Sequence, residues 1–112
     1  MVFIGSVVAD RGNFGQSNYS ATKGAIHAMA KSMARELARK QVRVNVVAPG
    51  FIDTDMVKGL EDPVREKLTR EIPMRRFGQP EDIAWATAYL LSPVASAYVT
   101  GEVLQVNGAL IT

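Results

Sequence analysis

The fold of this chain is decided by Val42–Gly50, which reads Val-Arg-Val-Asn-Val-Val-Ala-Pro-Gly. Residues 42–48 are rich in β-branched side chains, as is typical of a strand, and Pro49-Gly50 is a turn signal. A strand that ends at such a turn is expected at the carboxyl end of a parallel strand, where open α/β sheets bind their ligands. The stretch therefore predicts a parallel sheet with a ligand site next to Pro49.

Further elements are expected before and after this strand. Met1–Ile4 is a short apolar run without polar alternation, which suits a parallel strand buried on both faces. Residues 9–18, rich in Asp, Gly, Asn and Ser, are expected to be a loop. From Ser17 to about Arg39, apolar residues recur at three- and four-residue steps, which predicts an amphipathic helix. Val103–Val106 is expected to form the last strand.

Two helices that begin at prolines are expected between the second and third strands. Asp62-Pro63 predicts a helix over residues 63–71, with Asp62 as the N-cap and Pro63 at the first helical position. Gln79-Pro80 opens another helix, which ends at Ser92-Pro93. Residues 54–78 would then form a helical excursion over the site. The order strand-helix-strand-helices-strand implies right-handed crossovers and a three-stranded parallel sheet with covering helices.

The composition is that of an ordinary globular domain: of 112 residues, 47% are apolar and 21% charged. The formal charge of +2 gives no reason to expect nucleic acid. Without cysteine and with one histidine, neither a disulfide framework nor a metal site is expected. No apolar stretch approaches the ~18 residues of a membrane span, and the N-terminus does not resemble a signal segment. A cytoplasmic protein without a membrane partner is therefore expected.

Tyr19 and Lys23 are the most informative pair, four residues apart at the start of the expected long helix, with Ser6 thirteen residues before Tyr19. Positions i and i+4 share one helix face, so the phenol and the ammonium can reach a common point. A free phenol titrates near pH ~10, and a cation held close typically lowers a pKa by ~1 to 3 units. A phenol tuned in this way can donate or accept a proton.

Three segments around these residues resemble the second half of a short-chain dehydrogenase/reductase, most closely the 3-oxoacyl-[acyl-carrier-protein] reductases. They are Gly5–Val8, Gly12–Gly24 and Asn45–Thr54. The resemblance implies that Ser6 orients the substrate carbonyl, that Tyr19 is the general acid/base, and that Lys23 lowers the tyrosine pKa and holds the cofactor ribose. As separate residues, the three also fit a loop serine, a packed aromatic and an exposed lysine.

The resemblance covers essentially all of the chain but only the later part of a family member. The fold it implies is a partial Rossmann-like one, the second half of a doubly wound domain. Residues 1–112 are expected to be the C-terminal portion of a short-chain dehydrogenase/reductase domain, without its N-terminal dinucleotide-binding βαβ half. NADP(H) is expected as the cofactor in preference to NAD(H). Its binding to residues 1–112 alone is expected to be weak.

By the same resemblance, the loop that meets the nicotinamide end of the cofactor is expected at Pro49, Gly50, Ile52 and Thr54. The Ile52 backbone would exchange hydrogen bonds with the carboxamide, and the Thr54 hydroxyl would add a contact. Thr54 also fits a helix N-cap. Asn45, an amide inside an apolar strand, is expected to tie neighbouring loops together by hydrogen bonds.

Other polar residues near the site have two interpretations each. Gln16 fits a substrate pocket or, like Asn18, a cap, and capping is favoured. Arg39 and Lys40 fit a solvated helix end that complements the helix dipole, or a docking point for an acidic carrier protein. His27 is expected to be a packed or interface residue.

The resemblance also implies a homo-oligomer, because the two long helices pair across a subunit interface in the family. The residues of these helices that would form the apolar face are Met29, Met33, Trp85, Tyr89 and Leu90. Packing on the sheet is the alternative. Ala109 stands where the usual pattern has a second glycine, which puts the closing turn in doubt.

These observations predict an oxidoreductase that reduces a ketone with NAD(P)H, with 3-oxoacyl-[acyl-carrier-protein] reduced to 3-hydroxyacyl in fatty acid synthesis as the favoured reaction. The substrate is a small molecule or is bound to an acyl carrier. The 112 residues alone are expected to turn over little or nothing. The alternative is a non-catalytic oligomerisation or complementation module derived from such an enzyme.

Overall fold

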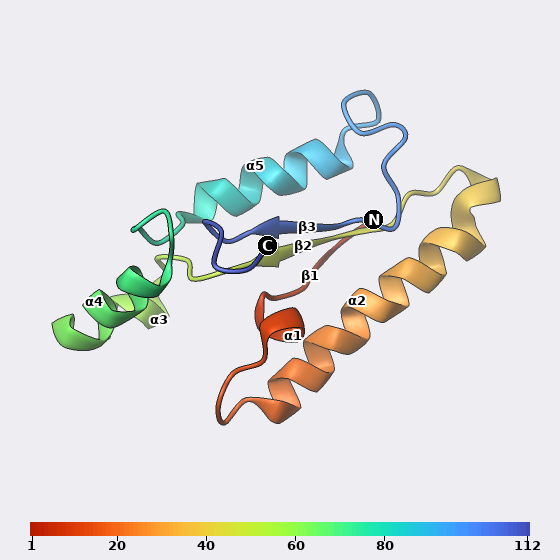
Figure 1. Cartoon of the computed structure of the whole chain (residues 1–112). Coiled ribbons are helices and arrows are strands. Elements are labelled where there is room, and N and C mark those ends of the chain that lie inside the picture. The colour runs from red at the N-terminus through yellow and green to blue at the C-terminus, as the bar shows by residue number, and fades with distance from the viewer.

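The computed structural model describes all 112 residues and builds three parallel strands between two long helices (Figure 1). Its helices and strands are β1 (Val2–Ile4), α1 (Val8–Arg11), α2 (Ser17–Leu37), η1 (Ala38–Lys40), β2 (Asn45–Pro49), α3 (Asp55–Lys58), α4 (Asp62–Glu71), α5 (Pro80–Leu91) and β3 (Val103–Val106). The predicted α/β class and the order of the main elements are confirmed.

The sheet has the order β1-β2-β3, with both pairs parallel, as predicted. β2 is the central strand, and Val46 pairs with Phe3 on one side and with Val103 on the other. The strand begins at Asn45 rather than at the predicted Val42, because β1 offers its first partner, Val2, opposite Asn45. A strand needs a neighbour for its backbone groups, and β-branched residues alone do not supply one.

The helices α2 and α5 cover opposite faces of the sheet (Figure 1). On the α2 side, Ala30 and Ala34 pack on Val44 and Val46, and all four are buried. The two alanines carry little side chain, so the helix lies close to β2. α2 ends at Leu37, two residues before the predicted end, and continues as the 3₁₀ turn η1.

The predicted loop over residues 9–18 is wrong at its start. Its first residues belong to the one-turn helix α1, because Ser6 accepts two hydrogen bonds from the residues that follow it. The Val8 N–H donates to Ser6 Oγ over 3.2 Å and the Ala9 N–H to the Ser6 carbonyl over 3.1 Å. At its other end the loop leads into α2, which begins at Ser17 as predicted.

The predicted N-cap of α4 is also wrong, because Asp62 lies inside the helix. The preceding Glu61 has extended backbone, with φ −61° and ψ 145°. Its carbonyl accepts the N–H groups of Val64 and Arg65 over 3.0 and 3.1 Å, which is the role of an N-cap carbonyl. Pro63 stays in the first turn, where its missing N–H costs no helical hydrogen bond.

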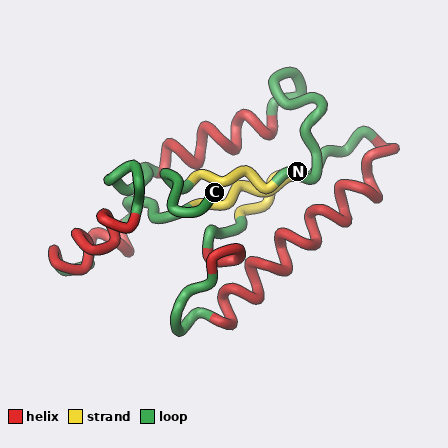
Figure 2. Tube along the Cα trace, viewed as in Figure 1, coloured by secondary structure: helices red, strands yellow, loops and turns green.

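α3 and α4 lie beyond the carboxyl ends of the strands, and loops join them to β2 and α5 (Figure 2). Arg65 of α4 anchors this excursion, since its guanidinium lies 3.1 Å from Asp53 Oδ2 and 4.6 Å from the ring centroid of Phe77. The predicted helical excursion over residues 54–78 is therefore present, as two short helices held to the loop after β2.

Asn45 ties neighbouring segments together as predicted. Its Nδ2 donates to the Val99 carbonyl over 2.9 Å, and its Oδ1 accepts the Glu102 N–H over 3.0 Å. At the C-terminus, Ala109 adopts a left-handed φ of 68°, which favours glycine and strains alanine. The closing turn forms in spite of this residue.

The expected apolar face on the two helices is only partly exposed. Leu90 is buried and Met33 packs against the core, so both belong to the sheet packing. Trp85 (76% exposed), Tyr89 and Met29 face outward. None of the helices is both long and apolar enough to cross a bilayer.

Candidate active site

A cleft of about 570 Å³ opens at the carboxyl ends of β1 and β2. Ser6 and Tyr19 line it together with Gln16, Gly50 and Phe51. Its far wall is α4, with Val64, Lys67, Leu68 and Glu71. The structure therefore brings a hydroxyl and a phenol to one cleft, under the helical excursion.

Ser6 follows β1 directly and is buried, with 7% of its surface exposed. Its Oγ accepts the Val8 N–H over 3.2 Å, which leaves the hydroxyl proton for a different acceptor. The N–H of the next residue, Val7, donates to the Pro49 carbonyl over 2.9 Å. The backbone that follows Ser6 is thus tied to the last residue of β2.

Tyr19 and Lys23 occupy the first two turns of α2. Tyr19 is 41% exposed, and the Lys23 ammonium lies 5.8 Å from its ring centroid, within the range of a cation–π contact. Lys23 Nζ also donates to the Ile4 carbonyl over 2.9 Å. The two side chains therefore lie close together, as predicted. Lys23 is not among the residues that line the cleft.

The loop after β2 places Gly50 in the cleft wall. Gly50 is required for space, because a Cβ there would lie 2.7 Å from Asn107 Cβ and 2.8 Å from Asn107 Cα. Thr54 is the N-cap residue of α3, as its alternative interpretation had it, and its carbonyl accepts two helical N–H groups. Its hydroxyl makes no capping hydrogen bond.

Two polar groups of the loop after β2 are free to bind a ligand. Asp53 and Thr54 donate their N–H groups to the Gly78 and Ile52 carbonyls, whereas the Ile52 N–H has no backbone partner. The exposed Thr54 hydroxyl is also free of a cap bond. A carboxamide needs such donors and acceptors. No strand in residues 1–112 is followed by a glycine-rich phosphate-binding loop.

Gln16 lines the cleft and precedes α2 as its N-cap residue, but its side chain does not cap the helix. Its Oε1 accepts Asn13 Nδ2 over 2.7 Å instead. Asn18 is a helical residue and not a cap, which corrects the expectation. Arg39 and Lys40 are exposed on η1, at the opposite end of α2 from Tyr19. At about 1.5 Å per residue they lie roughly 25 to 30 Å away, outside the cleft.

The sequence interpretation missed an ion pair at the mouth of the cleft. Arg11 of α1 donates to Glu71 of α4 over 3.0 Å, and both residues line the cleft. No local pattern marks this pair, because the two residues are 60 positions apart. The only available signal was the charge of each side chain.

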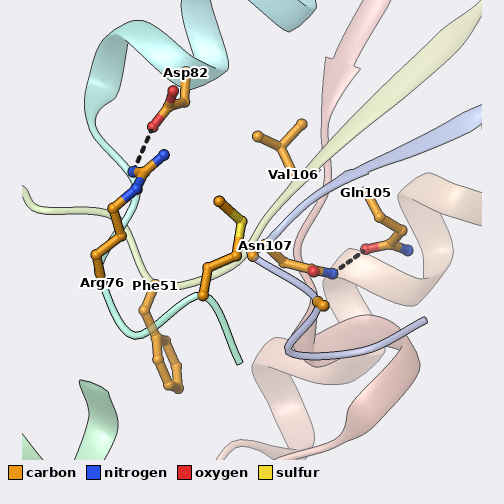
Figure 3. A pocket seen from close by; sticks show the side chains of 10 residues that line it. Phe51, Arg76, Asp82, Gln105, Val106 and Asn107 are labelled. Carbon is orange, nitrogen blue, oxygen red and sulfur yellow. Dashed lines mark hydrogen bonds and ion pairs between the residues drawn. The ribbon is translucent and has the colours of Figure 1, made fainter. Parts of the chain in front are cut away.

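A second cavity, of about 320 Å³, also borders Phe51 and is lined by residues before and in α5 and by residues 105–109 (Figure 3). Arg76 and Asp82 form an ion pair of 3.4 Å there, and Asn107 Nδ2 donates to Gln105 Oε1 over 3.3 Å. The Gln79 N–H, 2.8 Å from Asp82 Oδ2, is the main reason that the pKa of Asp82 is lowered, and Arg76 adds to it. Desolvation opposes both. No cluster of three or more metal-ligating side chains occurs in the chain.

Comparison with known proteins gives consistent similarities. Residues 1–110 match a family model described as enoyl-(acyl carrier protein) reductase. An acetoacetyl-CoA reductase from Synechocystis sp. is 64% identical over 109 residues, which are 97% of this chain and 45% of that protein. The 3-oxoacyl-[acyl-carrier-protein] reductase FabG of Vibrio cholerae is 51% identical over 110 residues, 98% of this chain and 45% of that protein. Carbonyl reductase family member 4 of Xenopus tropicalis is 49% identical over 98% of this chain and 44% of its own length. The chain spans about half the length of these relatives.

Proposed function

Because the chain belongs to the short-chain dehydrogenase/reductase family of oxidoreductases, we propose that its residues perform the proton transfer of an NAD(P)H-dependent ketone reduction. The observation that carries the proposal is the common cleft of Ser6 and Tyr19, with the Lys23 ammonium beside the tyrosine ring. The substrate class is a 3-oxoacyl thioester, on a carrier protein or coenzyme A. The names of the relatives at 64% and 51% identity, an acetoacetyl-CoA reductase and a 3-oxoacyl-[acyl-carrier-protein] reductase, support this class.

In this reaction Ser6 Oγ donates its hydrogen bond to the substrate carbonyl oxygen, because the Val8 N–H already occupies one of its acceptor sites. Tyr19 gives its phenolic proton to the same oxygen as negative charge develops there. Lys23, whose ammonium donates to the Ile4 carbonyl, stabilises the phenolate form of Tyr19 that remains after this transfer. Tyr19 regains a proton from solvent, to which it is 41% exposed.

A bound nicotinamide cofactor would supply the hydride to the carbonyl carbon. Its holders in this chain are Lys23 and Tyr19 on α2 and the loop residues Pro49, Gly50, Ile52 and Thr54. We propose NADP(H) as the cofactor. Residues 1–112 then act as the C-terminal portion of the domain, and the phosphate and adenosine contacts come from outside them. The 112 residues by themselves bind cofactor weakly and turn over little.

The partners follow from exposed side chains. Arg39 and Lys40 are exposed cations at the end of α2 and suit the docking of an acidic acyl carrier. Trp85, Tyr89 and Met29 are exposed apolar residues on the two long helices and suit a homo-oligomer contact. The proposed setting is the cytoplasm, without nucleic acid or membrane.

Replacing Tyr19 by phenylalanine in the complete enzyme, cofactor-binding part included, tests the proposal. Nicotinamide absorbance reports the reduction of acetoacetyl-CoA and of a 3-oxoacyl carrier protein. Tyr19→Phe removes only the hydroxyl, so we expect kcat to fall by about 10²- to 10⁴-fold, the usual worth of a general acid.

Tyr98→Phe is the matched control, since Tyr98 is fully exposed and lies outside the cleft. Its activity should equal that of the wild type. Full activity of Tyr19→Phe would refute the acid role. It would leave the second candidate, a non-catalytic assembly module, which the exposed Trp85 favours.

A further inference from the structure

The helix α4 forms the far wall of the cleft, yet none of its residues is buried. Its ten residues, Asp62–Glu71, lie beyond the carboxyl ends of the strands (Figure 1). A helix of this length is marginal in water by itself, so α4 depends on contacts with the rest of the chain. Because it has no buried apolar face, its position must come from contacts at particular side chains.

Two ion pairs join α4 to other segments. Arg65, in the first half of the helix, lies 3.1 Å from Asp53 in the loop after β2. Glu71, the last residue of the helix, accepts a hydrogen bond from Arg11 Nη2 of α1 over 3.0 Å. Among the ion pairs and side-chain hydrogen bonds of α4, the pair with Arg11 is the one that reaches the wall that carries Ser6.

Glu71 is not placed for the stability of its own helix. The last turn is the negative end of the helix dipole, where a cation such as Arg70 is favourable and an acid is not. The side chains of Arg11 and Glu71 are 38% and 35% exposed, and an exposed ion pair adds little to the stability of a fold. The pair therefore matters for where α4 lies rather than for whether the chain folds.

The segment that carries Arg11 is itself tied to the sheet. The Val7 N–H, just before α1, donates to the Pro49 carbonyl of β2 over 2.9 Å. Asp10, next to Arg11, accepts Gln105 Nε2 of β3 over 2.8 Å. Arg11 therefore holds α4 against a segment that is bonded to two strands.

The handle of the proposed substrate has to pass this contact. The reacting ketone lies at Ser6 and Tyr19, and Ser6 is buried. The nucleotide of coenzyme A, or a whole carrier protein, does not fit beside the acyl group in a cleft of about 570 Å³. The handle must therefore leave through the mouth of the cleft, between Arg11 and Glu71 of its two walls.

The wall formed by α4 has the chemistry of the arm that both handles share. Coenzyme A and acyl carrier proteins hold the acyl group on the same pantetheine arm, a chain of methylenes and methyls interrupted by amides. Val64 and Leu68 lie one turn apart on the cleft side of α4, and Lys67 adds an ammonium that can donate to an amide oxygen. An apolar stripe with one donor suits such an arm.

We propose that Arg11 and Glu71 are positioning residues for the pantetheine arm of the substrate. By joining α1 to α4, the ion pair holds Val64 and Leu68 against the arm. Binding energy then comes from a part of the substrate that is distant from the ketone. This inference rests on the proposed function, and it adds which part of the thioester the outer cleft recognises.

The test compares Arg11→Gln, Glu71→Gln and the exchange of both charges, Arg11→Glu with Glu71→Arg, in the complete enzyme. The substrates are acetoacetyl-CoA and ethyl acetoacetate, which has the same 3-oxoacyl group without the arm. We expect each single replacement to raise KM for acetoacetyl-CoA by about 2- to 5-fold at unchanged kcat, as for the loss of an exposed ion pair that acts on binding. The exchange should restore KM. The values for ethyl acetoacetate should not change in any variant.

Two further substrates separate the arm from what it is attached to. Acetoacetyl-pantetheine lacks the nucleotide, and an acetoacetyl carrier protein replaces it, so both should show the same rise in KM as acetoacetyl-CoA. If Arg11 instead bound a phosphate of the nucleotide, Glu71→Gln would free its guanidinium and lower KM for acetoacetyl-CoA. That result would overturn the inference, and so would an equal rise of KM for ethyl acetoacetate.

Glu66→Gln is the matched control, because it removes an exposed acid of α4 whose partner, Arg70 at 4.0 Å, lies on the same helix. Its KM should equal that of the wild type.

Amide hydrogen exchange of residues 62–71, followed by mass spectrometry, gives a readout that needs no turnover. Exchange should be faster in Arg11→Gln and Glu71→Gln than in Glu66→Gln, and the charge exchange should restore it, because the pair holds α4 in place. Unchanged exchange in both single variants would overturn the inference. If the wild type reduces no 3-oxoacyl thioester, the proposed function fails, while faster exchange still supports the link between α1 and α4.

Discussion

At the scale of single residues, the glycines differ in how much space surrounds the position of a Cβ atom. Gly5 leaves room for the His27 ring and for Val46, whose Cγ1 would lie 2.8 Å from an added Cβ. Gly24, on α2, has no atom within 4 Å of an added Cβ. The same substitution should therefore have opposite effects at the two positions.

Gly5→Ala should lower the free energy of unfolding by about 1 to 3 kcal/mol, the usual cost of overpacking. Gly24→Ala should raise the free energy of unfolding by about 1 kcal/mol, since alanine is the better helix former. Chemical denaturation measures both. An unchanged free energy of unfolding in Gly5→Ala would contradict the packing of His27 and Val46 around Gly5.

At the scale of elements, the N-terminus of α5 depends on the ionisation of Asp82. Its carboxylate accepts the Gln79 N–H over 2.8 Å, and this bond, with a contribution from Arg76, lowers the pKa of Asp82. A carboxyl whose pKa is lower in the folded state stabilises the fold above its ordinary pKa. This stabilisation is lost as the pH falls through the lowered value.

Asp82→Ala should therefore lower Tm at neutral pH, and the difference from the wild type should shrink below the ordinary carboxyl pKa of ~3.9 and vanish at still lower pH. Thermal unfolding followed by circular dichroism across this range measures it. Glu81→Ala is the control, because it removes an acidic side chain from the same turn without breaking the bond to Gln79. A difference that does not change with pH would refute the assignment.

Elements with local signals were predictable from the sequence, and elements that depend on distant partners were not. The apolar period of α2 and the Gln79-Pro80 start of α5 lie within the helices themselves, so both were found. α1 was missed because its first hydrogen bonds come from Ser6, and β2 begins late because of its partner β1. In the site, Ser6 and Tyr19 were predicted from the family resemblance. The ion pair between Arg11 and Glu71 was not predicted, because its residues lie in two distant segments that no sequence motif connects.

At the scale of the whole molecule, few residues are buried and several large apolar side chains are exposed. Only 16 of 112 residues are buried, and the chain extends over 50 × 29 × 23 Å. Trp85, Tyr98 and Met56 are each more than three-quarters exposed. A partner that covers such a side chain, as the proposed homo-oligomer would cover Trp85, adds to the stability of the fold.

Trp85→Lys should separate assembly from folding in the complete enzyme. Trp85 is 76% exposed, so its replacement should change the fold of a subunit little, while a lysine in an apolar contact carries an unpaired charge. We expect a smaller particle by light scattering and a Tm that no longer rises with protein concentration. Glu81→Lys, a change at an exposed position of the same helix, is the control. An unchanged particle would place the subunit contact elsewhere.

The ion pair between Arg11 and Glu71 has a consequence for protein engineering. Exposed pairs of this kind add little stability, so its importance is geometric: it aligns α4 with α1 across the cleft. A chimera that grafts a foreign segment over residues 54–78 to change substrate preference would also replace position 71. Such a graft should retain an acid there, or replace Arg11 together with it, for the new helix to take up the same angle over the cleft.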